Sequence, residues 1–584
     1  MNLRCLAALP LLATLALAQQ HAPSFNESLE MQAPSAPALS PDGRWVAYGV
    51  RAADWEQNAY VTQLWLASSD GSRRFQLTRG RKSAGMARWS PDGRWIAFVA
   101  ERPADADRAP AAPPAAPAAE AEDRKPAPRQ IWLISPSGGE AWAISRHPTD
   151  VNDFRWSPDG RRIAFTAAAH ESPESKRRGN LYSDFTVFEH DYTQTQLFSL
   201  DAAAAEPAQM PAGDVALVSD RKLNVAGFDW SPDGAQIAFA ATPDPLLADG
   251  SESDIYLVRA EPGAQPRKIV ALPGPETNPK FSPDGTQLVF QTALAQPENF
   301  YANQHLATVS LAAVVAQPAT SAAAVRDLTG GFDEDPSLIG WGPGGIYFSA
   351  SQKTEAAVFR LAPGGTPQRL NRAPSYRVTG ASFSRDDGAW AFLSSDPTHM
   401  AEVEVSPAAG FAPQRVTDFS RKLAAYTLGT AEVISWKSSD GTTIEGVLHK
   451  PADFVAGRKY PLLVVIHGGP TGVSNAALNP VDSYYPIQRF LARGALVLEP
   501  NYRGSAGYGA SFRALNVRNL GVGDMWDVMS GVDALIARGL ADPAHLGAMG
   551  WSEGGYISAF LTTHTDRFQA ISVGAGISDW TTYY

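Results

Sequence analysis

Ser552 stands at the centre of a Gly-x-Ser-x-Gly pentapeptide that spans residues 550–554. A serine hydroxyl in such a turn can attack a carbonyl carbon and form an acyl-enzyme once a base has taken its proton. The apolar residues 546–549 precede the turn, and residues 556–563 have the composition of a helix. Because a strand, a tight turn and a helix form the context that this motif requires, the sequence predicts Ser552 as a nucleophile. A chance match in a loop is the alternative.

Two backbone N–H groups are expected to bind the negatively charged oxygen that forms during such an attack. Glu553 follows the serine at the start of the expected helix, so its N–H would face that oxygen. The second N–H is predicted at Gly469, in a glycine-rich turn at residues 467–470. Glycine is expected at Gly550 and Gly554 because side chains there would collide with the neighbouring strand and helix.

Buried strands and an amphipathic helix surround these residues in the sequence. Residues 460–466 form a nearly continuous apolar run that ends at the glycine-rich turn, and residues 495–498 form a second run. Such runs are typical of parallel strands that are buried on both faces. Residues 524–538 carry apolar side chains at helical spacing. Residues 426–584 are therefore predicted to form an α/β-hydrolase domain.

A Ser-Pro-Asp-Gly motif recurs through the first two thirds of the chain, each time followed by a short apolar run. Clear copies begin at Ser40, Ser90, Ser157, Ser231 and Ser282, and weaker ones begin at Gly342 and Ser384. Proline presets φ, aspartate bonds nearby backbone and glycine closes the turn, so each copy is predicted to be a scaffold turn between strands. With about four strands for each repeat, an all-β propeller is predicted over residues 19–425. The copies predict seven blades, with six or eight as alternatives.

Residues 103–129 interrupt the second repeat. They are rich in alanine, proline and mixed charges, and they carry no periodic apolar face. This composition predicts a disordered surface insertion, with a functional lid as the alternative.

Residues 1–18 are predicted to be an export signal. Arg4 is the only charge before an apolar stretch, and residues 16–18 match a small-residue cleavage site. The mature chain would then begin near Gln19, after cleavage at Ala18, in the bacterial periplasm or outside the cell. An uncleaved anchor is the alternative. No later segment has the ~20 apolar residues of a transmembrane helix, so no membrane contact is expected of the mature form.

The composition narrows the possible partners and cofactors. The formal net charge of −11 argues against nucleic acid, because phosphate binding needs clustered lysines and arginines. Cys5 is the only cysteine and lies in the predicted export signal, so a disulfide or a cysteine-ligated metal is not expected. No metal-ligating cluster or nucleotide motif stands out, and neither a cofactor nor a metal is predicted.

Taken together, the motifs resemble the prolyl oligopeptidase family of serine peptidases, in its acylaminoacyl-peptidase and dipeptidyl-peptidase-like branch. They are the Ser-Pro-Asp-Gly repeats, HGGP at 467–470, NYRGSAGYG at 501–509, GVGDMWDV at 521–528 and GWSEGGY at 550–556. The resemblance implies a propeller that caps the hydrolase domain, with an active site between them that admits short peptides and excludes folded proteins. It also implies Ser552 as nucleophile, with oxyanion donors at Glu553 and Gly469. His467 would belong to the oxyanion turn rather than act as the base.

Two features depart from the family pattern. Glu553 stands where the family often has tyrosine or asparagine, and an acid there could change substrate preference. In α/β-hydrolases the order is serine, acid, histidine, with both partners well past the serine, and here 584 − 552 = 32 residues follow Ser552. His564, Asp566 and Asp579 lie too close in sequence to be those partners. We therefore expect a C-terminally truncated chain that lacks the triad Asp and His and is inactive as printed. A natural catalytically dead form is the alternative.

The function predicted from the sequence is a serine peptidase that hydrolyses short peptides, as an exopeptidase or an oligopeptidase. A periplasmic propeller that binds proteins and carries a vestigial hydrolase segment is one alternative, and an esterase is another. Glu171, Glu189 and Asp191 are candidates for anchoring a free amino terminus, with a solvated loop as the simpler interpretation of each. Neither cleavage specificity nor oligomeric state follows from the sequence.

Overall fold

The computed structural model describes residues 20–102, 127–170, 173–182, 187, 189, 191–203, 205, 210–218, 222–294, 296, 301–371, 377–478, 485–577 and 579. The predicted export signal at residues 1–18 lies outside this part of the chain, as do residues 103–126 of the predicted insertion. Within it, no helix combines the length and apolar character needed to cross a membrane.

Strands β1 to β28 form seven antiparallel sheets of four strands, each built from consecutive strands of the described chain. The first three are β1 (Ala33–Leu39), β2 (Trp45–Asp54), β3 (Ala59–Ser68), β4 (Arg74–Gln76); β5 (Ala84–Trp89), β6 (Ile96–Ala100), β7 (Gln130–Ile134), β8 (Trp142–Ala143); and β9 (Val151–Trp156), β10 (Arg162–Ala168), β11 (Thr195–Asp201), β12 (Asp214–Ala216). The fourth and fifth are β13 (Asn224–Trp230), β14 (Gln236–Thr242), β15 (Asp254–Arg259), β16 (Arg267–Val270); and β17 (Glu276–Phe281), β18 (Gln287–Thr292), β19 (His305–Ser310), β20 (Arg326–Asp327). The last two, linked by one parallel bridge, are β21 (Ser337–Gly342), β22 (Gly345–Gln352), β23 (Glu355–Leu361), β24 (Gln368–Arg369); and β25 (Arg377–Phe383), β26 (Ala389–Ser395), β27 (Glu402–Pro407), β28 (Gln414–Arg415).

Each Ser-Pro-Asp-Gly motif closes the turn between the first two strands of its sheet. At Ser282 the hydroxyl donates to Asp284 Oδ1 at 2.6 Å and accepts from the backbone N–H of Gln287 at 2.9 Å. Gly285 ends the turn with φ +71°, a conformation that glycine adopts without steric cost. These hydrogen bonds stay within the turn, which agrees with a scaffold role for the motif.

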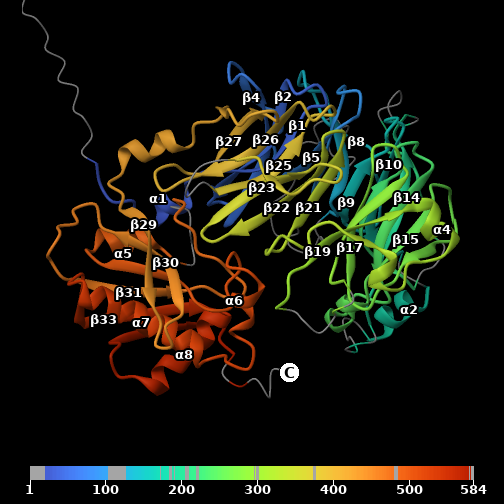
Figure 1. The fold of residues 1–584 in the computed structure, drawn as a ribbon. Coiled ribbons are helices and arrows are strands. Elements are labelled where there is room, and N and C mark those ends of the chain that lie inside the picture. The colour runs from blue at the N-terminus through green and yellow to red at the C-terminus, as the bar shows by residue number, and fades with distance from the viewer. Residues whose placement is uncertain are drawn as a thin grey trace, which may run out of the picture.

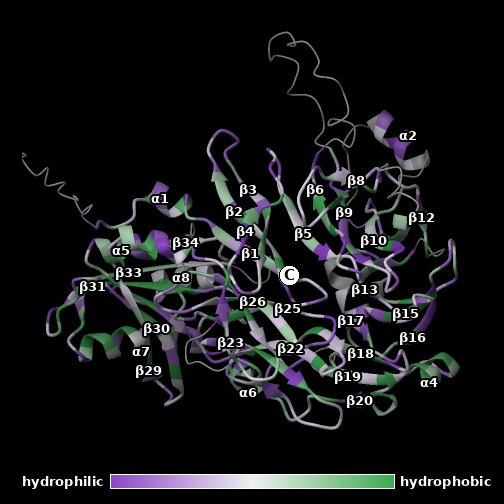
Figure 2. Cartoon of the chain, turned by 90° about the horizontal axis from the view of Figure 1, so that it is seen from above, coloured by the Kyte–Doolittle hydropathy of each residue, from purple (hydrophilic) through white to green (hydrophobic). Residues whose placement is uncertain are grey.

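The seven sheets follow one another around a closed ring, called the ring below (Figures 1 and 2). A Cβ atom added at Gly285 would lie 3.4 Å from Pro232 Cδ of the preceding turn, and earlier turns repeat this contact. The ring closes where the backbone N–H of Arg385, in the last turn, donates to the carbonyl of Pro41 in the first turn at 3.1 Å. A shared core seals that junction, formed by residues of the first and seventh sheets: Leu39, Val46, Tyr48, Val50, Ala67, Ala391, Val403, Val405 and Val416.

Strands β29 to β34 form a separate six-stranded sheet, the C-terminal sheet. They are β29 (Thr430–Lys437), β30 (Thr443–Lys450), β31 (Tyr460–Ile466), β32 (Leu496–Asn501), β33 (Ala541–Trp551) and β34 (Ala570–Gly574). The strand order is β29-β30-β32-β31-β33-β34, and the last four are parallel to one another. The antiparallel pair of β29 and β30 was not predicted from the sequence, because neither strand is a continuous apolar run.

Helices cover both faces of the C-terminal sheet (Figure 1). They are α5 (Ile487–Ala492), α6 (Ala510–Ala514), α7 (Gly523–Ala537) and α8 (Glu553–His564). Val528, Val532 and Leu535 of α7 and Ile557 and Leu561 of α8 pack against the buried side chains of β30, β31 and β32. The other described helices are short: α1 (Phe25–Leu29), α2 (Pro173–Tyr182), α4 (Leu311–Ala316) and the 3₁₀ helices Leu247–Glu252, Ala322–Ala324 and Ser420–Ala425.

The turn contacts make a test of the ring packing possible. Gly285→Ala places a methyl group against Pro232 and forces a positive φ on an L-residue, so we expect the free energy of unfolding to fall by about 1–2 kcal/mol. Gly331→Ala is the matched control, because no atom lies within 4 Å of an added Cβ there. Urea denaturation followed by tryptophan fluorescence measures both. Equal stability of the two variants would show that the turn tolerates a side chain at the positive φ of Gly285.

Candidate active site

Ser552 lies between the end of β33 and the start of α8. Its backbone has φ +57° and ψ −121°, which side-chain-bearing residues seldom adopt. Two hydrogen bonds hold this conformation: Ser552 N–H donates to the Gly574 carbonyl at 3.0 Å, and Tyr556 N–H donates to the Ser552 carbonyl at 2.9 Å. The structure therefore shows the strand, tight turn and helix that the sequence predicts around Ser552.

Close backbone contacts require the glycines of this turn. A Cβ atom at Gly550 would overlap the carbonyl group of Gly554, and one at Gly554 would overlap the carbonyl of Ile466 in β31. Gly555 is equally constrained, since its Cβ position overlaps the Gly574 carbonyl in β34. Sequence reasoning missed Gly555, although the second glycine in the Gly-Gly pair was a visible signal.

The glycine-rich turn after β31 faces the serine. A Cβ atom added at Gly468 would lie 3.1 Å from Ser552 Cβ and 3.7 Å from Ser552 Oγ. Gly468 thus lies close to the serine side chain. The predicted oxyanion donor Gly469 is next in the chain, with φ +138° and a cis bond to Pro470. Among the described residues, none makes a hydrogen bond to Ser552 Oγ.

His467 is held in place behind this turn. Its ring Nδ1 lies 2.8 Å from the Gly468 carbonyl, and its Nε2 lies 3.0 Å from Ser505 Oγ. The ring stacks on Tyr502 with centroids 4.5 Å apart, and burial lowers the pKa of His467. Both ring nitrogens have partners other than Ser552, so His467 positions the turn and does not contact the serine hydroxyl.

A buried ion pair fixes the segment that supports His467. Arg503 directly follows Tyr502, its side chain is 2% exposed, and it donates to both carboxylate oxygens of Asp527 in α7 at 2.8 and 2.9 Å. Asp440 accepts a further bond at 3.0 Å, and Ser438 donates to Asp527 at 2.6 Å. Sequence reasoning quoted the Arg503 motif only for its resemblance. Three aspartates among the apolar residues of α7, of which Asp527 lies on the buried side, were the signal that could have revealed the pair.

Two buried acids, Glu553 and Asp524, lie beneath the serine turn. In the described part of the chain, neither has a paired cation of the kind that Arg503 provides for Asp527. The Glu553 side chain is 2% exposed, and its Oε1 has no hydrogen-bond partner in the described structure. Burial, and then the nearby Asp524 carboxyl, raise the pKa of Glu553 to about 7. Burial likewise raises the pKa of Asp524 to about 6. The Glu553 side chain thus points into the protein, which argues against the idea that it meets the substrate directly.

Comparisons with known proteins agree with this arrangement. Residues 483–584 match the prolyl oligopeptidase family. The uncharacterized peptidase YuxL of Bacillus subtilis is 25% identical over 561 residues, which cover 94% of this chain and 81% of the relative. Dipeptidyl-peptidase 5 of Porphyromonas gingivalis is 26% identical, covering 92% of this chain and 76% of the relative. The family match over residues 483–584 and the two longer relatives support a serine-type peptidase related to the prolyl oligopeptidase family.

The structural comparison extends the family likeness to the fold of both parts. The acylaminoacyl peptidase of Pyrococcus horikoshii superposes with a TM-score of 0.72 at 19% sequence identity, over 97% of this chain and 80% of that chain. A puromycin-hydrolyzing peptidase of Mycobacterium tuberculosis gives a TM-score of 0.67 at 16% identity, over 97% and 81%. The ring and the C-terminal sheet thus occur together in solved structures of this fold.

The other acids and histidines singled out in the sequence do not reach the serine. His564 lies exposed at the end of α8, where its ring stacks on Phe560 at 3.8 Å, and Asp566 is exposed two residues later. Asp579 is exposed as well. In the third sheet, Asp191 is bound by Arg178 and by the N–H of Val187, Glu189 is exposed, and Glu171 lies outside the described residues.

Removing Asp527 would leave the Arg503 guanidinium buried without its main partner. We expect Asp527→Ala to lower the free energy of unfolding by about 3–5 kcal/mol, because an uncompensated buried charge is costly. Asp440→Asn weakens a more exposed contact of the same guanidinium and should cost about 1 kcal/mol or less. Chemical denaturation at neutral pH compares the two. A loss for Asp440→Asn as large as that for Asp527→Ala would contradict the assignment.

The raised pKa of Glu553 predicts a pH effect on stability. Its folded-state pKa of about 7 exceeds the ordinary value of 4.5, so its stabilising contribution is complete below pH 4.5 and is lost as the pH rises to about 7. The Glu553→Gln variant has no carboxyl to ionise at this position. Between pH 5 and pH 8, its free energy of unfolding should therefore rise by up to about 3 kcal/mol relative to that of the parent. Asp524 contributes with the same sign, so some slope should remain.

The measurement is the unfolding midpoint in urea at several pH values between 5 and 8. Asp566→Asn, which removes an exposed acid of the same region, is the control and should follow the parent. Parallel curves for Glu553→Gln and the parent would show that the Glu553 carboxyl does not change its ionisation on unfolding in this range.

Proposed function

We propose that Ser552 is the nucleophile with which this peptidase cleaves short peptides through an acyl-enzyme. The observation that carries the proposal is the geometry of Ser552, which has a positive φ at the start of α8 and packs against the glycine-rich turn at Gly468. A turn of this kind presents the hydroxyl to substrate while backbone N–H groups face the developing oxyanion. A related structure supports the substrate class, since it is an acylaminoacyl peptidase in complex with Z-Gly-Gly-Phe-chloromethyl ketone.

In this reaction the Ser552 oxygen attacks the scissile carbonyl carbon, and its proton passes to a base. The N–H groups of Glu553 and Gly469 bind the resulting oxyanion. Collapse of the tetrahedral intermediate breaks the C–N bond, and the base returns the proton to the leaving amine. Water then attacks the acyl-enzyme by the same route and releases the acid.

The base and its acid partner are not found among the described residues near Ser552. The relatives named above are matched over 76–81% of their own length. We propose that both groups come from sequence beyond the matched part, and that this chain by itself does not turn over peptides.

The ring is proposed to be a seven-bladed β-propeller that restricts access to Ser552. A cavity of about 380 Å³ lies between the two parts of the molecule. Pro34, Arg377 and Met400 line it from the ring, and His449 and His467 line it from the C-terminal sheet. The cavity adjoins the glycine-rich turn at His467, and Ser552 is not among its lining residues. A space of this size suits a few residues of peptide and not a folded chain. The size of the cavity favours an exopeptidase or an oligopeptidase. If residues 1–18 direct export, the enzyme would act on peptides in the periplasm or the medium.

An active-site label tests the nucleophile. A fluorophosphonate probe should label the product of the longest reading frame that contains this chain, and Ser552→Ala should abolish labelling, because the probe forms a bond only with an activated serine. Ser530→Ala, which removes an exposed hydroxyl in α7, is the matched control and should label normally. The chain ending at Tyr584 should label at least tenfold more slowly. Labelling that survives in Ser552→Ala would refute the proposal, and cleavage of esters but not of peptide amides would favour an esterase.

A further inference from the structure

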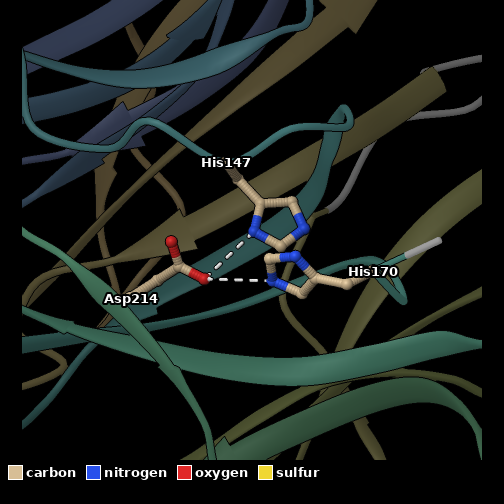
Figure 3. Close-up of side chains that lie close together, drawn as sticks. All are labelled: His147, His170 and Asp214. Atoms are coloured by element: carbon tan, nitrogen blue, oxygen red, sulfur yellow. Dashed lines mark hydrogen bonds and ion pairs between the residues drawn. The ribbon is translucent and has the colours of Figure 1, made fainter. Parts of the chain in front are cut away.

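Two histidines and an aspartate converge on one point in the third sheet, far along the chain from Ser552 (Figure 3). His147 lies between β8 and β9, His170 follows β10, and Asp214 is the first residue of β12. One ligand atom from each lies within 4.8 Å of the other two. Sequence reasoning predicted no metal here, because the three residues are widely spaced along the chain and only the strand pairing brings them together.

The protein holds the His147 ring in one orientation. Its side chain is fully buried, and Phe198 packs against the ring with centroids 4.5 Å apart. Gln130 accepts from the His147 N–H at 2.7 Å and donates to its carbonyl at 2.9 Å, which clamps the backbone. The ring Nε2 lies 3.2 Å from the carbonyl of Ala168. The other ring nitrogen, Nδ1, faces Asp214.

Both nitrogens of the His147 ring face oxygen atoms that accept hydrogen bonds. A neutral ring has only one N–H, so its lone pair faces either Asp214 Oδ2, 3.1 Å from Nδ1, or the Ala168 carbonyl, 3.2 Å from Nε2. Either a second proton on His147 or a bound metal ion removes the repulsion. His170 Nε2 points at the same oxygen from 3.9 Å, which is beyond hydrogen-bond distance. The His170 ring also packs edge-on against the rings of His147 and Phe198, with centroids 4.9 and 5.7 Å apart. A proton on His147 involves only His147 and Asp214, whereas a metal ion would use all three groups.

The dimensions suit a small transition-metal ion. Bonds of about 2.0–2.1 Å to nitrogen and oxygen in tetrahedral geometry place neighbouring ligand atoms about 3.3 Å apart. The 3.1 and 3.9 Å separations bracket that value, and the separation of the two histidine nitrogens is at most 4.8 Å. Metal binding would therefore draw the exposed His170 ring toward the other two groups. The bond from His147 Nε2 to the Ala168 carbonyl is the outer contact that metal-bound histidines usually make. Two imidazoles and one carboxylate favour Zn²⁺ or Co²⁺ over Mg²⁺ or Ca²⁺.

We propose that His147, His170 and Asp214 bind one zinc-type divalent ion, with water in the fourth position on the exposed side of His170. The ion would fasten the segment that leaves β10 toward α2 to the start of β12. The site involves none of the residues assigned to peptide cleavage, so it stands or falls independently of the proposed function.

Metal analysis of the full, untagged chain tests the site. After incubation with Zn²⁺ and dialysis, elemental analysis should find one equivalent per chain. His170→Gln and Asp214→Asn should each lose that equivalent. His545→Gln is the matched control, because His545 is exposed and pairs with a single carboxylate, Asp542, and it should retain the metal. No bound zinc in the parent chain, or equal retention in all variants, would overturn the proposal.

Cobalt substitution reports the geometry directly. Co²⁺ bound by four ligands gives visible absorption bands that hexaaqua Co²⁺ lacks, and we expect them in the parent and in His545→Gln but not in His170→Gln. Zn²⁺ should raise the thermal unfolding midpoint of the parent and leave that of His170→Gln unchanged. His170 is 54% exposed at its side chain, so its loss should not prevent folding, whereas a His147 variant could simply misfold. A spectrum unchanged by His170→Gln would place the metal elsewhere and refute the site.

Discussion

The close approach of three backbone segments around Ser552 is the constraint on which the site depends. The last residues of β33, the first turn of α8 and the end of β31 leave no room for a single methyl group at Gly550 or Gly554. The chain can pass through this space only by turning sharply, and the residue at the turn takes a positive φ. Because β31 also leads into the glycine-rich turn, the same contact that strains Ser552 brings Gly468 against it. The strain at Ser552 is offset by the packing of the parallel strands and α8 on either side.

Buried charge divides the support of this site into two unlike halves. On the side of the glycine-rich turn, Arg503 and Asp527 form paired hydrogen bonds that fix the segment around Arg503. Tyr502 belongs to this segment, and the His467 ring stacks on it. Beneath α8, Glu553 and Asp524 are both acids, and no described cation pairs with the unsatisfied Glu553 oxygen. The first half is a stable arrangement at any pH near neutrality. The half that contains Glu553 and Asp524 favours a bound proton. The buried region beneath the serine turn is therefore neutral when Glu553 is protonated and carries a charge when Glu553 is ionised.

The sequence was sufficient for features that depend on neighbouring residues and insufficient for those that depend on strand pairing. The serine turn, the parallel strands β31 and β32 and the Ser-Pro-Asp-Gly turns all carry local signals of proline, glycine or continuous apolar residues. The contact between Arg385 and Pro41 that closes the ring joins residues 344 positions apart in the chain (385 − 41 = 344), and no local pattern announces it. The convergence of His147 and Asp214 likewise depends on which strands pair in the third sheet. Gly468 was taken as part of a motif, and only the geometry shows how near it lies to the serine side chain.

Contacts along residues 502–513 connect the ring to the segment that holds His467. The N–H groups of Gly507 and Gly509, a few residues after Arg503, both donate to the Glu334 carboxylate of the ring at 3.1 Å. Arg513 of the same stretch pairs with Asp335 at 2.8 Å. Gly507 needs to be glycine because a Cβ atom there would lie 2.6 Å from the Lys353 carbonyl. Since Tyr502 and Ser505 begin this stretch and contact His467, the contacts with the ring and the support of the glycine-rich turn lie on one continuous segment.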